Sequence, residues 1–334
     1  MTIDQIKRLR LQRQHLICQT TSNTVVRDLC GLQAQYLSHA LHALSVRTQK
    51  LHTDDMVKTW TLRGTMHLIT EEDLPLFLYE GRSHFLRPMD TMDTDEFVTA
   101  KRKAYFAELI MDAVSGGTDD RESLKQLCRE KGMTEREGES LFNPWGGLIR
   151  AMCESGKICH KVQEKKAYRP CPAFVPMEKE AAQLALARRY FTHYGPATVK
   201  DAAYFFGTTQ AQVKAWLHKL PVTAITVGSS VFYHIDQGER NKEIPHCLLL
   251  AGFDPLLLGY EKTESVFLPR EFLREVFTLS GIVRPTVLTD GKITGWWNYK
   301  NRKLTVTDFG GCQKYAIEDT ASSIFPDIKQ IIIA

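Results

Sequence analysis

Two glutamines separated by one small residue, Gln33-Ala34-Gln35, are the side chains of this sequence whose type and spacing could do chemistry. Side chains two positions apart lie on the same side of an extended backbone, so both amides could bind one small molecule. An amide oxygen accepts hydrogen bonds, and two of them can orient one water molecule. Glutamines in a polar turn are more often solvated or cap a helix, and the spacing alone leaves that alternative open.

The residues on either side of this pair predict two amphipathic helices joined by a short connection. Apolar residues recur at helical spacing before and after it, at Val25, Val26, Leu29, Leu37, Ala40, Leu41 and Leu44. Gly31 is expected to end the first helix, because glycine readily adopts the left-handed conformation found there. Gln33 and Gln35 then fall in the connection.

The excess positive charge of the chain is concentrated around this pair. Residues 1–50 contain seven Lys/Arg and two Asp/Glu, whereas the remainder contains 36 basic and 37 acidic residues. A surface that faces phosphates would need such an excess. A basic helix that is merely solvated is the alternative.

A first helix is expected over residues 4–16. Its predicted inward positions are Ile6, Leu9 and Leu16. Arg10 and Arg13 are predicted to face outward, where they would be available to phosphates.

The whole composition is that of an ordinary soluble protein, with 43% hydrophobic and 25% charged residues in a chain of 334. No apolar run reaches the length of a membrane span, and the charged start MTIDQIKRLR is not a signal peptide. We therefore expect a cytoplasmic protein without a membrane partner.

Eight cysteines without regular spacing are expected to be reduced thiols. Cys153, Cys159, His160 and Cys171 raise the question of zinc, but no pair of them has the gap of about two to four residues typical of a structural zinc site. No phosphate-binding loop is present either. We expect neither a metal nor another cofactor.

The order helix, helix, helix, ribbon recurs along the chain, and this is the order of a winged helix. The predicted fold class is α+β, with three tandem winged-helix units at 1–95, 96–172 and 173–244 and a small C-terminal β-barrel at 245–334.

Each unit is predicted from local signals. In the first unit, Thr53-Asp54-Asp55 is expected to cap a helix through Thr59, a ribbon follows over 60–70, and a helix then begins at Glu71. Later helices are expected at 96–114, 121–131, 141–153, 177–192, 198–206 and 210–220. Hairpins are expected at 156–169 and 221–235, and Asp290-Gly291 is a strong hairpin signal in the barrel.

The ribbons supply candidate DNA contacts. Arg63 and His67 would project from the first ribbon, and Lys165 and Lys166 form the basic tip of the second. A lone histidine on a strand is more often structural, and exposed hairpin tips are commonly charged for solubility, so both alternatives stay open.

Four blocks of sequence resemble the AlkZ/YcaQ-like family of winged-helix DNA glycosylases, which includes azinomycin-resistance and interstrand-crosslink-unhooking enzymes. The blocks are Gly-Leu-Gln-Ala-Gln at 31–35, Leu-Arg-Gly-Thr-Met-His-Leu at 62–68, Phe-Asp-Pro-Leu-Leu-Leu-Gly-Tyr at 253–260 and Val-Arg-Pro-Thr-Val-Leu-Thr-Asp-Gly at 283–291. The resemblance covers nearly the whole chain.

This resemblance implies three winged helices and a barrel that grip DNA, and hydrolysis of the N-glycosidic bond of N7-alkylated guanine. It also implies that Gln33 and Gln35 are catalytic, because the family signature is Gln, an aliphatic residue, then Gln or Asp. Glu261-Lys262 departs from the basic pair that relatives often carry after Gly259-Tyr260, which puts a nucleic-acid contact there in doubt. The C-terminus lacks the alanine-rich helix usual in the family.

Two uncharged amides could suffice for this reaction. Most glycoside hydrolysis uses two carboxylates, one of which protonates the leaving group. An N7-alkylated base is already cationic and departs neutral, so what remains is to position a water beneath C1′ and to tolerate the cation that develops on the sugar. Without an identifiable Schiff-base lysine, we expect a monofunctional enzyme that acts as a monomer on double-stranded DNA carrying alkylated bases or crosslinks.

Two other functions remain open. A non-catalytic winged-helix transcriptional regulator would bind a particular sequence, although such regulators usually carry one unit per subunit and dimerise. A protein-interaction scaffold would associate with DNA with little dependence on salt.

Overall fold

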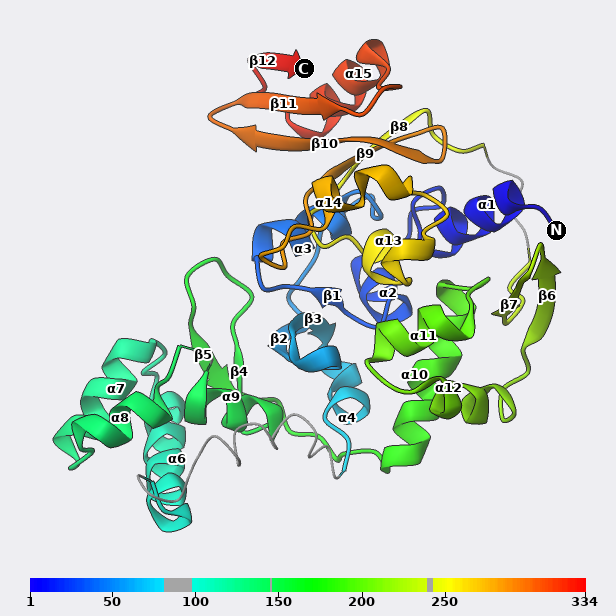
Figure 1. The fold of residues 1–334 in the computed structure, drawn as a ribbon. Helices are drawn as coiled ribbons and strands as arrows, with labels where there is room; N and C mark the ends of the chain where they lie inside the picture. The colour runs from blue at the N-terminus through cyan, green and yellow to red at the C-terminus, as the bar shows by residue number, and fades with distance from the viewer. Residues whose placement is uncertain (81–97, 145, 239–242) are drawn as a thin grey trace. The chain divides into compact units, whose positions relative to one another are not determined.

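The computed structural model describes residues 1–80, 98–144, 146–238 and 243–334 (Figure 1). The chain divides into two compact units, one of residues 1–52 and 186–334 and the other of residues 53–185. Helices and mainly antiparallel sheets occur in both, with β11 (Lys303–Asp308) and β12 (Gln330–Ile333) a parallel pair of the first unit, which confirms the α+β class. The boundary predicted between 95 and 96 lies outside the described residues, as does the start of the helix predicted at 96, and the four predicted segments stay a prediction.

In the first unit, helices begin at residues whose side chains satisfy free backbone N–H groups. Thr2 and Gln5 form a reciprocal capping box at the first helix, and Thr21, Thr198 and Thr209 cap three later ones. The helices are α1 (Ile3–Arg13), α2 (Ser22–Asp28), α3 (Leu37–Ser45), the end of α10 (Lys179–His193), α11 (Val199–Phe206), α12 (Gln210–Leu217), α13 (Pro255–Leu258), α14 (Leu273–Val276) and α15 (Lys314–Ile324).

The main sheet of the first unit has the strand order β12-β11-β10-β9-β8. Its strands are β8 (Cys247–Leu250), β9 (Thr286–Thr289), β10 (Lys292–Lys300), β11 (Lys303–Asp308) and β12 (Gln330–Ile333). Asp290 and Gly291 both have positive φ, 47° and 78°, as the predicted two-residue hairpin between β9 and β10 requires. In the described residues, β8 and β12 are the edges of this sheet, so the closed barrel is not confirmed.

A helix pair and a ribbon follow α10 in the first unit. Gly207 ends α11 in the left-handed conformation (φ 62°), and Thr209 caps α12. The ribbon β6 (Thr223–Val227) and β7 (Ser230–His234) is antiparallel, turns at Gly228-Ser229 and lies within the hairpin predicted over 221–235. The remaining strand of this unit is the short β1 (Leu32–Gln33).

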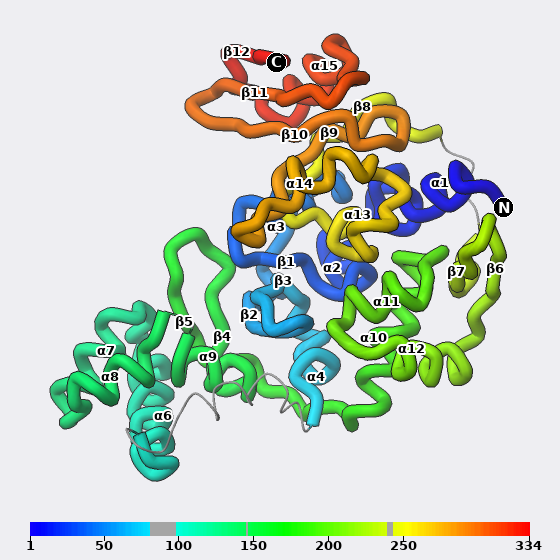
Figure 2. The backbone as a smooth tube through the Cα atoms, in the orientation of Figure 1, coloured from blue at the N-terminus to red at the C-terminus, as the bar shows by residue number. Residues whose placement is uncertain are grey.

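The second unit contains a sheet in which β2 (Met56–Trp60) pairs with β3 (Met66–Thr70) and with β4 (Ile158–His160), and β4 pairs with β5 (Tyr168–Pro170). The loop between β4 and β5 extends well beyond the paired residues (Figures 1 and 2). Its helices are α4 (Leu74–Phe77), α6 (Ala100–Ser115), α7 (Arg121–Glu130), α8 (Glu135–Leu141), α9 (Gly147–Glu154) and the start of α10. α6 to α9 share one apolar core with Ile158 and Tyr168.

Three element predictions were wrong. Residues 56–60 are the strand β2 rather than a helix, since Thr53 to Asp55 form a turn closed by the Met56 N–H and the strand is buried on both faces. The helix predicted over 141–153 begins only at Gly147, as α9, because α8 ends at Leu141 and the chain turns at Gly146 and Gly147, both with positive φ. α15 was not predicted, and its Ile317 and Ala321 pack into the core of the β8–β12 sheet.

The outward orientation predicted for Arg10 and Arg13 was also wrong, because both are buried, with 1% and 4% exposure. Arg10 donates to the Pro196 carbonyl at 2.8 Å and pairs with Asp201 at 3.4 Å. Arg13 donates to the Gly195 carbonyl at 3.2 Å. Part of the excess positive charge therefore holds the first unit together.

No helix in the described part of the chain is long and apolar enough to cross a membrane.

Candidate active site

The connection between α2 and α3 has the geometry that the sequence predicts. Gly31 adopts a φ of 81° after α2, a conformation that costs glycine little, and the chain is extended at β1. Ala34 is fully buried, so it fixes the backbone while its two neighbours turn away from the core.

Gln33 and Gln35 are brought together by this backbone. Gln33 Nε2 donates a hydrogen bond to Gln35 Oε1 at 2.7 Å, at the protein surface. Gln35 is exposed and Gln33 half-buried. A carbonyl oxygen has two lone pairs, so Gln35 Oε1 can accept a second hydrogen bond, for example from a water.

On the α2 side, the backbone of the connection is anchored to α10 and to Tyr194, the residue that follows it. The buried Tyr194 hydroxyl donates to the Leu29 carbonyl at 2.9 Å. Arg189 donates to the Arg27 carbonyl at 3.3 Å. The Arg27 carbonyl also accepts from the Cys30 N–H at 3.1 Å, whereas Tyr194 supplies a side-chain donor to the Leu29 carbonyl at the end of α2.

On the α3 side, a buried ion pair fixes the helix. Arg47 and Asp254 are both fully buried and form two hydrogen bonds, at 2.7 and 3.0 Å. Arg47 also donates to the carbonyls of Gln14 and Ala43, so the guanidinium is well satisfied. His42 Nε2 donates to the Leu249 carbonyl at 2.7 Å.

Residues of the sequence block at 253–260 contact the connection and the side chains that anchor it. Its Asp254 forms the ion pair just described. Phe253 stacks on Tyr36, with ring centroids 5.7 Å apart and planes at 21°. The Tyr260 hydroxyl donates to the Tyr194 carbonyl at 2.9 Å. A Cβ at Gly259 would approach the Tyr194 ring to 2.3 Å, so only glycine fits there.

Tyr36 and His39 follow the pair in the chain and were not predicted from the sequence as candidate site residues. Tyr36 is 50% exposed although it is a large aromatic residue, and His39 packs edge-on against it. Burial is the larger cause that lowers the pKa of His39, and the nearby His42 lowers it further, so this ring is neutral at neutral pH. The signal in the sequence was adjacency to Gln35, but the exposure of Tyr36 required the structure.

Arg63 and His67 lie in the second unit, on the β2–β3 hairpin. Arg63 forms the turn with a φ of 56° and is half-buried. His67 is buried, with 2% exposure, and its Nδ1 lies 3.1 Å from the Thr65 carbonyl. A DNA contact at either residue stays a prediction, and the burial of His67 argues against a direct phosphate contact there.

Lys165 and Lys166 lie side by side in the exposed loop between β4 and β5. Beneath them, His160 of β4 is buried, and burial lowers its pKa to about 3, with further contributions from Lys58 and Lys166. The DNA-contact role of the two lysines stays a prediction.

Comparison with known proteins gives a consistent result. The sequence model of a family described as DNA glycosylase AlkZ-like matches residues 26–321. The interstrand DNA cross-link repair glycosylase of Streptomyces sahachiroi is 26% identical over 341 positions, which cover 92% of this chain and 91% of that protein. The solved structure of Streptomyces sahachiroi DNA glycosylase AlkZ aligns with a TM-score of 0.80 at 22% identity, over 100% of this chain and 99% of that one, which shows a shared fold.

Proposed function

Since the chain belongs to the AlkZ-like DNA glycosylase family, as the four sequence blocks predict, we propose that it hydrolyses the N-glycosidic bond of N7-alkylated guanine in double-stranded DNA. We further propose that it unhooks interstrand crosslinks made through that atom, as the name of its Streptomyces sahachiroi relative suggests. The product is an abasic site, and the enzyme acts as a cytoplasmic monomer.

The observation that carries this proposal is the Gln33–Gln35 hydrogen bond of 2.7 Å on an anchored backbone. The bond aligns the two amides and leaves Gln35 Oε1 with a lone pair for a water. Because the connection is fastened by Tyr194 and by the Arg47–Asp254 pair, the amides are held in place before DNA binds. Preorganised dipoles of this kind need no rearrangement during the reaction.

The chemistry follows from the leaving group. N7-alkylguanine carries a positive charge and leaves as a neutral base, so the enzyme needs no general acid. The water held by the pair attacks C1′ as the bond to the base breaks, its proton passes to the solvent, and the amide oxygens face the cation that develops on the sugar. Neutral lesions such as uracil lack the activated leaving group and are not excised.

Tyr36 supplies an aromatic face beside the pair. Its ring is half-exposed and held by Phe253, and an exposed aromatic face can stack on a nucleobase or sugar. Placed next to Gln35, it would limit where the alkylated nucleotide lies relative to the water.

Three winged-helix units and a C-terminal barrel remain the proposed DNA-binding scaffold. The order α11, α12, β6, β7 supports one such unit, and the order of α6 to α9 followed by β4 and β5 supports another. In this scaffold Lys165 and Lys166 contact phosphates.

The test is release of N7-methylguanine from a labelled duplex, measured as strand scission at the abasic site under single-turnover conditions. The parent is expected to cleave this duplex and not one containing uracil. Gln33→Ala and Gln35→Ala are each expected to lower the rate by about 100-fold or more, in line with the loss of one preorganised polar group. Duplex binding is expected to be unchanged, because the pair positions water rather than DNA.

Gln126→Ala is the matched control. Gln126 is an exposed glutamine that donates to Glu130 at 3.0 Å on α7, so its loss removes a similar hydrogen bond away from the connection. Excision of uracil at a comparable rate would contradict the mechanism. Binding of DNA without any cleavage by the parent would favour the transcriptional-regulator alternative.

A further inference from the structure

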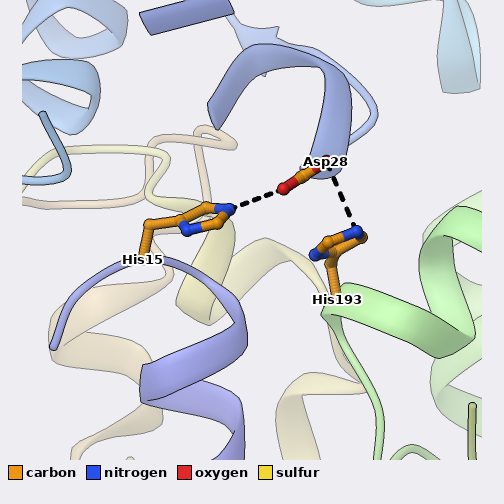
Figure 3. A group of neighbouring side chains, drawn as sticks. All are labelled: His15, Asp28 and His193. Atoms are coloured by element: carbon orange, nitrogen blue, oxygen red, sulfur yellow. Dashed lines mark hydrogen bonds and ion pairs between the residues drawn. The ribbon is translucent and has the colours of Figure 1, made fainter. Parts of the chain in front are cut away.

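His15, Asp28 and His193 converge at one point of the first unit, outside the Gln33–Gln35 pair (Figure 3). His15 follows the end of α1, Asp28 is the last residue of α2, and His193 is the last residue of α10. His15 Nε2 lies 2.7 Å from Asp28 Oδ2, and His193 Nε2 lies 3.3 Å from Asp28 Oδ1. One ligand atom of each residue lies within 4.8 Å of the other two.

The tautomer of His193 leaves a lone pair directed at the carboxylate. His193 Nδ1 lies 3.4 Å from the Arg13 carbonyl, which can only accept, so Nδ1 carries a proton. In the neutral ring, Nε2 is then an acceptor that faces another acceptor, Asp28. A cation between Nε2 and the carboxylate would relieve the repulsion between these two acceptors, which lie 3.3 Å apart.

We propose that His15, Asp28 and His193 bind a divalent first-row transition-metal ion such as Zn²⁺. Two imidazoles and one carboxylate are ligands for such ions, whereas Mg²⁺ and Ca²⁺ prefer oxygen alone. The hydrogen bond between Nδ1 of His193 and a backbone carbonyl is the usual outer support of a metal-bound histidine.

The spacing of the ligand atoms suits an ion of this size. Metal–ligand distances of about 2.0–2.2 Å place neighbouring ligand atoms about 3.0–3.5 Å apart. The 3.3 Å separation between His193 Nε2 and Asp28 Oδ1 already fits, and the 2.7 Å separation between His15 Nε2 and Asp28 Oδ2 needs to open by a few tenths of an ångström, so each oxygen of Asp28 faces one imidazole. The three side chains are 15%, 23% and 18% exposed, which leaves room for water to complete the coordination.

The ion would fasten the start of the connection that carries the glutamines. Asp28 lies between Arg27 and Leu29, whose carbonyls accept hydrogen bonds from Arg189 of α10 and from Tyr194, the residue that follows α10. A metal bridge from Asp28 to His193 would add a third tie between α2 and α10, and His15 would extend it to the end of α1. The role is structural, and its test does not depend on glycosylase activity.

The experiment uses the full chain without a polyhistidine tag, after removal of metal with a chelator. Calorimetric titration with Zn²⁺ is expected to show one site per chain. His15→Gln and His193→Gln are each expected to weaken binding at least tenfold, because each removes one of three ligands. Co²⁺ is expected to give visible absorption typical of nitrogen and oxygen ligation.

His246→Gln is the matched control. His246 Nδ1 lies 2.8 Å from Asp290 Oδ1 with both side chains largely exposed, and among the described residues this pair belongs to no three-ligand group. Its loss is expected to leave Zn²⁺ affinity unchanged. Circular dichroism checks that each variant is folded. The Co²⁺ spectrum is recorded on the parent protein, so this result does not depend on the folding of any variant.

Three results would overturn the proposal. They are the absence of Zn²⁺ binding by the parent, equal affinity in folded His193→Gln, and a Co²⁺–thiolate absorption band, which would place the ion on cysteines.

Discussion

The connection that carries Gln33 and Gln35 and the loop that carries Lys165 and Lys166 are both short polar segments, but they are held very differently. Buried side chains anchor the first on both sides, through Tyr194 and through the Arg47–Asp254 pair. The residues at the tip of the second are exposed.

The difference matches what each segment would have to do. Orienting one water requires atoms fixed to within a few tenths of an ångström, so the support must be rigid and water-free. Attracting a polyanion requires charge but little precision, so a solvated loop suffices. Substitutions beneath the connection should therefore reduce stability and catalysis together, whereas substitutions in the loop should affect only DNA binding.

The largest expected effect follows from Asp254→Ala. It leaves Arg47 buried without its charged partner, which is expected to lower the free energy of unfolding by about 3–5 kcal/mol. Urea denaturation measures the loss. Glu264→Ala is the control, because it breaks an exposed pair with Lys200 (2.6 Å) and should cost less than about 1 kcal/mol. Equal costs for the two variants would remove the contrast between anchored and exposed segments.

A smaller effect is expected from Tyr194→Phe. It removes the donor to the Leu29 carbonyl and leaves a buried acceptor unsatisfied, at a cost of about 1–3 kcal/mol. Thermal and urea denaturation measure it, and excision should slow as the connection loosens. Tyr299→Phe removes an exposed hydroxyl bonded to Asp327 at 2.8 Å and should change stability by less than about 0.5 kcal/mol. A stable Tyr194→Phe variant with full activity would show that this anchor is dispensable.

The stability of the β4–β5 hairpin, whose loop carries Lys165 and Lys166, should depend on pH through the buried His160 at its base and not through its exposed tip. His160 is buried, and its two ring nitrogens have no hydrogen-bond partner within the described residues. The folded protein keeps this ring neutral down to about pH 3, whereas the unfolded chain takes up the proton near an ordinary pKa of about 6.5. The contribution of neutral His160 to the free energy of unfolding is therefore fully present above about pH 6.5. It decreases by about 1.4 kcal/mol per pH unit as the pH falls from there toward about 3.

His160→Leu tests this dependence. The difference in unfolding free energy between the variant and the parent is expected to shift in favour of the variant between pH 7 and pH 5. Parallel stability curves for the two proteins would mean that His160 is protonated in the folded state as readily as in the unfolded one.

The smallest effect on stability is expected from Lys165→Ala combined with Lys166→Ala. Exposed lysines contribute little to folding, so the change should stay within about 0.5 kcal/mol. Duplex affinity should fall several-fold at low salt, and the slope of log affinity against log salt should decrease in magnitude by about 2. Lys131→Ala, which alters an exposed lysine after α7, should leave the slope unchanged. An unchanged slope in the double variant would exclude the loop from the DNA interface.

The local parts of the fold and site could be predicted from the sequence. Gly31 fixes the end of α2, and the Asp290-Gly291 turn fixes a hairpin, because each depends on residues that are adjacent in the chain. The apposition of Gln33 and Gln35 follows from their spacing on an extended backbone in the same way.

The other parts depend on distant partners. Arg10 looked solvent-facing because its partners, Pro196 and Asp201, are 186 and 191 positions away. The grouping of His15, Asp28 and His193 has no sequence signal, since three separate helix ends supply it. β2 looked helical because Thr53-Asp54-Asp55 serves equally well as a cap or as a turn, and only the neighbouring strands decide between them.

The Arg47–Asp254 pair also has a consequence for biosynthesis. Its two residues are 207 positions apart, so the ribosome must add most of the remaining chain after Arg47 emerges before the pair can form. At about 5–20 residues per second, that interval is on the order of 10–40 seconds. During it the N-terminal helices carry an arginine whose buried partner does not yet exist. A nascent chain therefore cannot assemble a fully anchored glutamine pair until Asp254 has left the ribosome, which delays catalytic competence until late in translation.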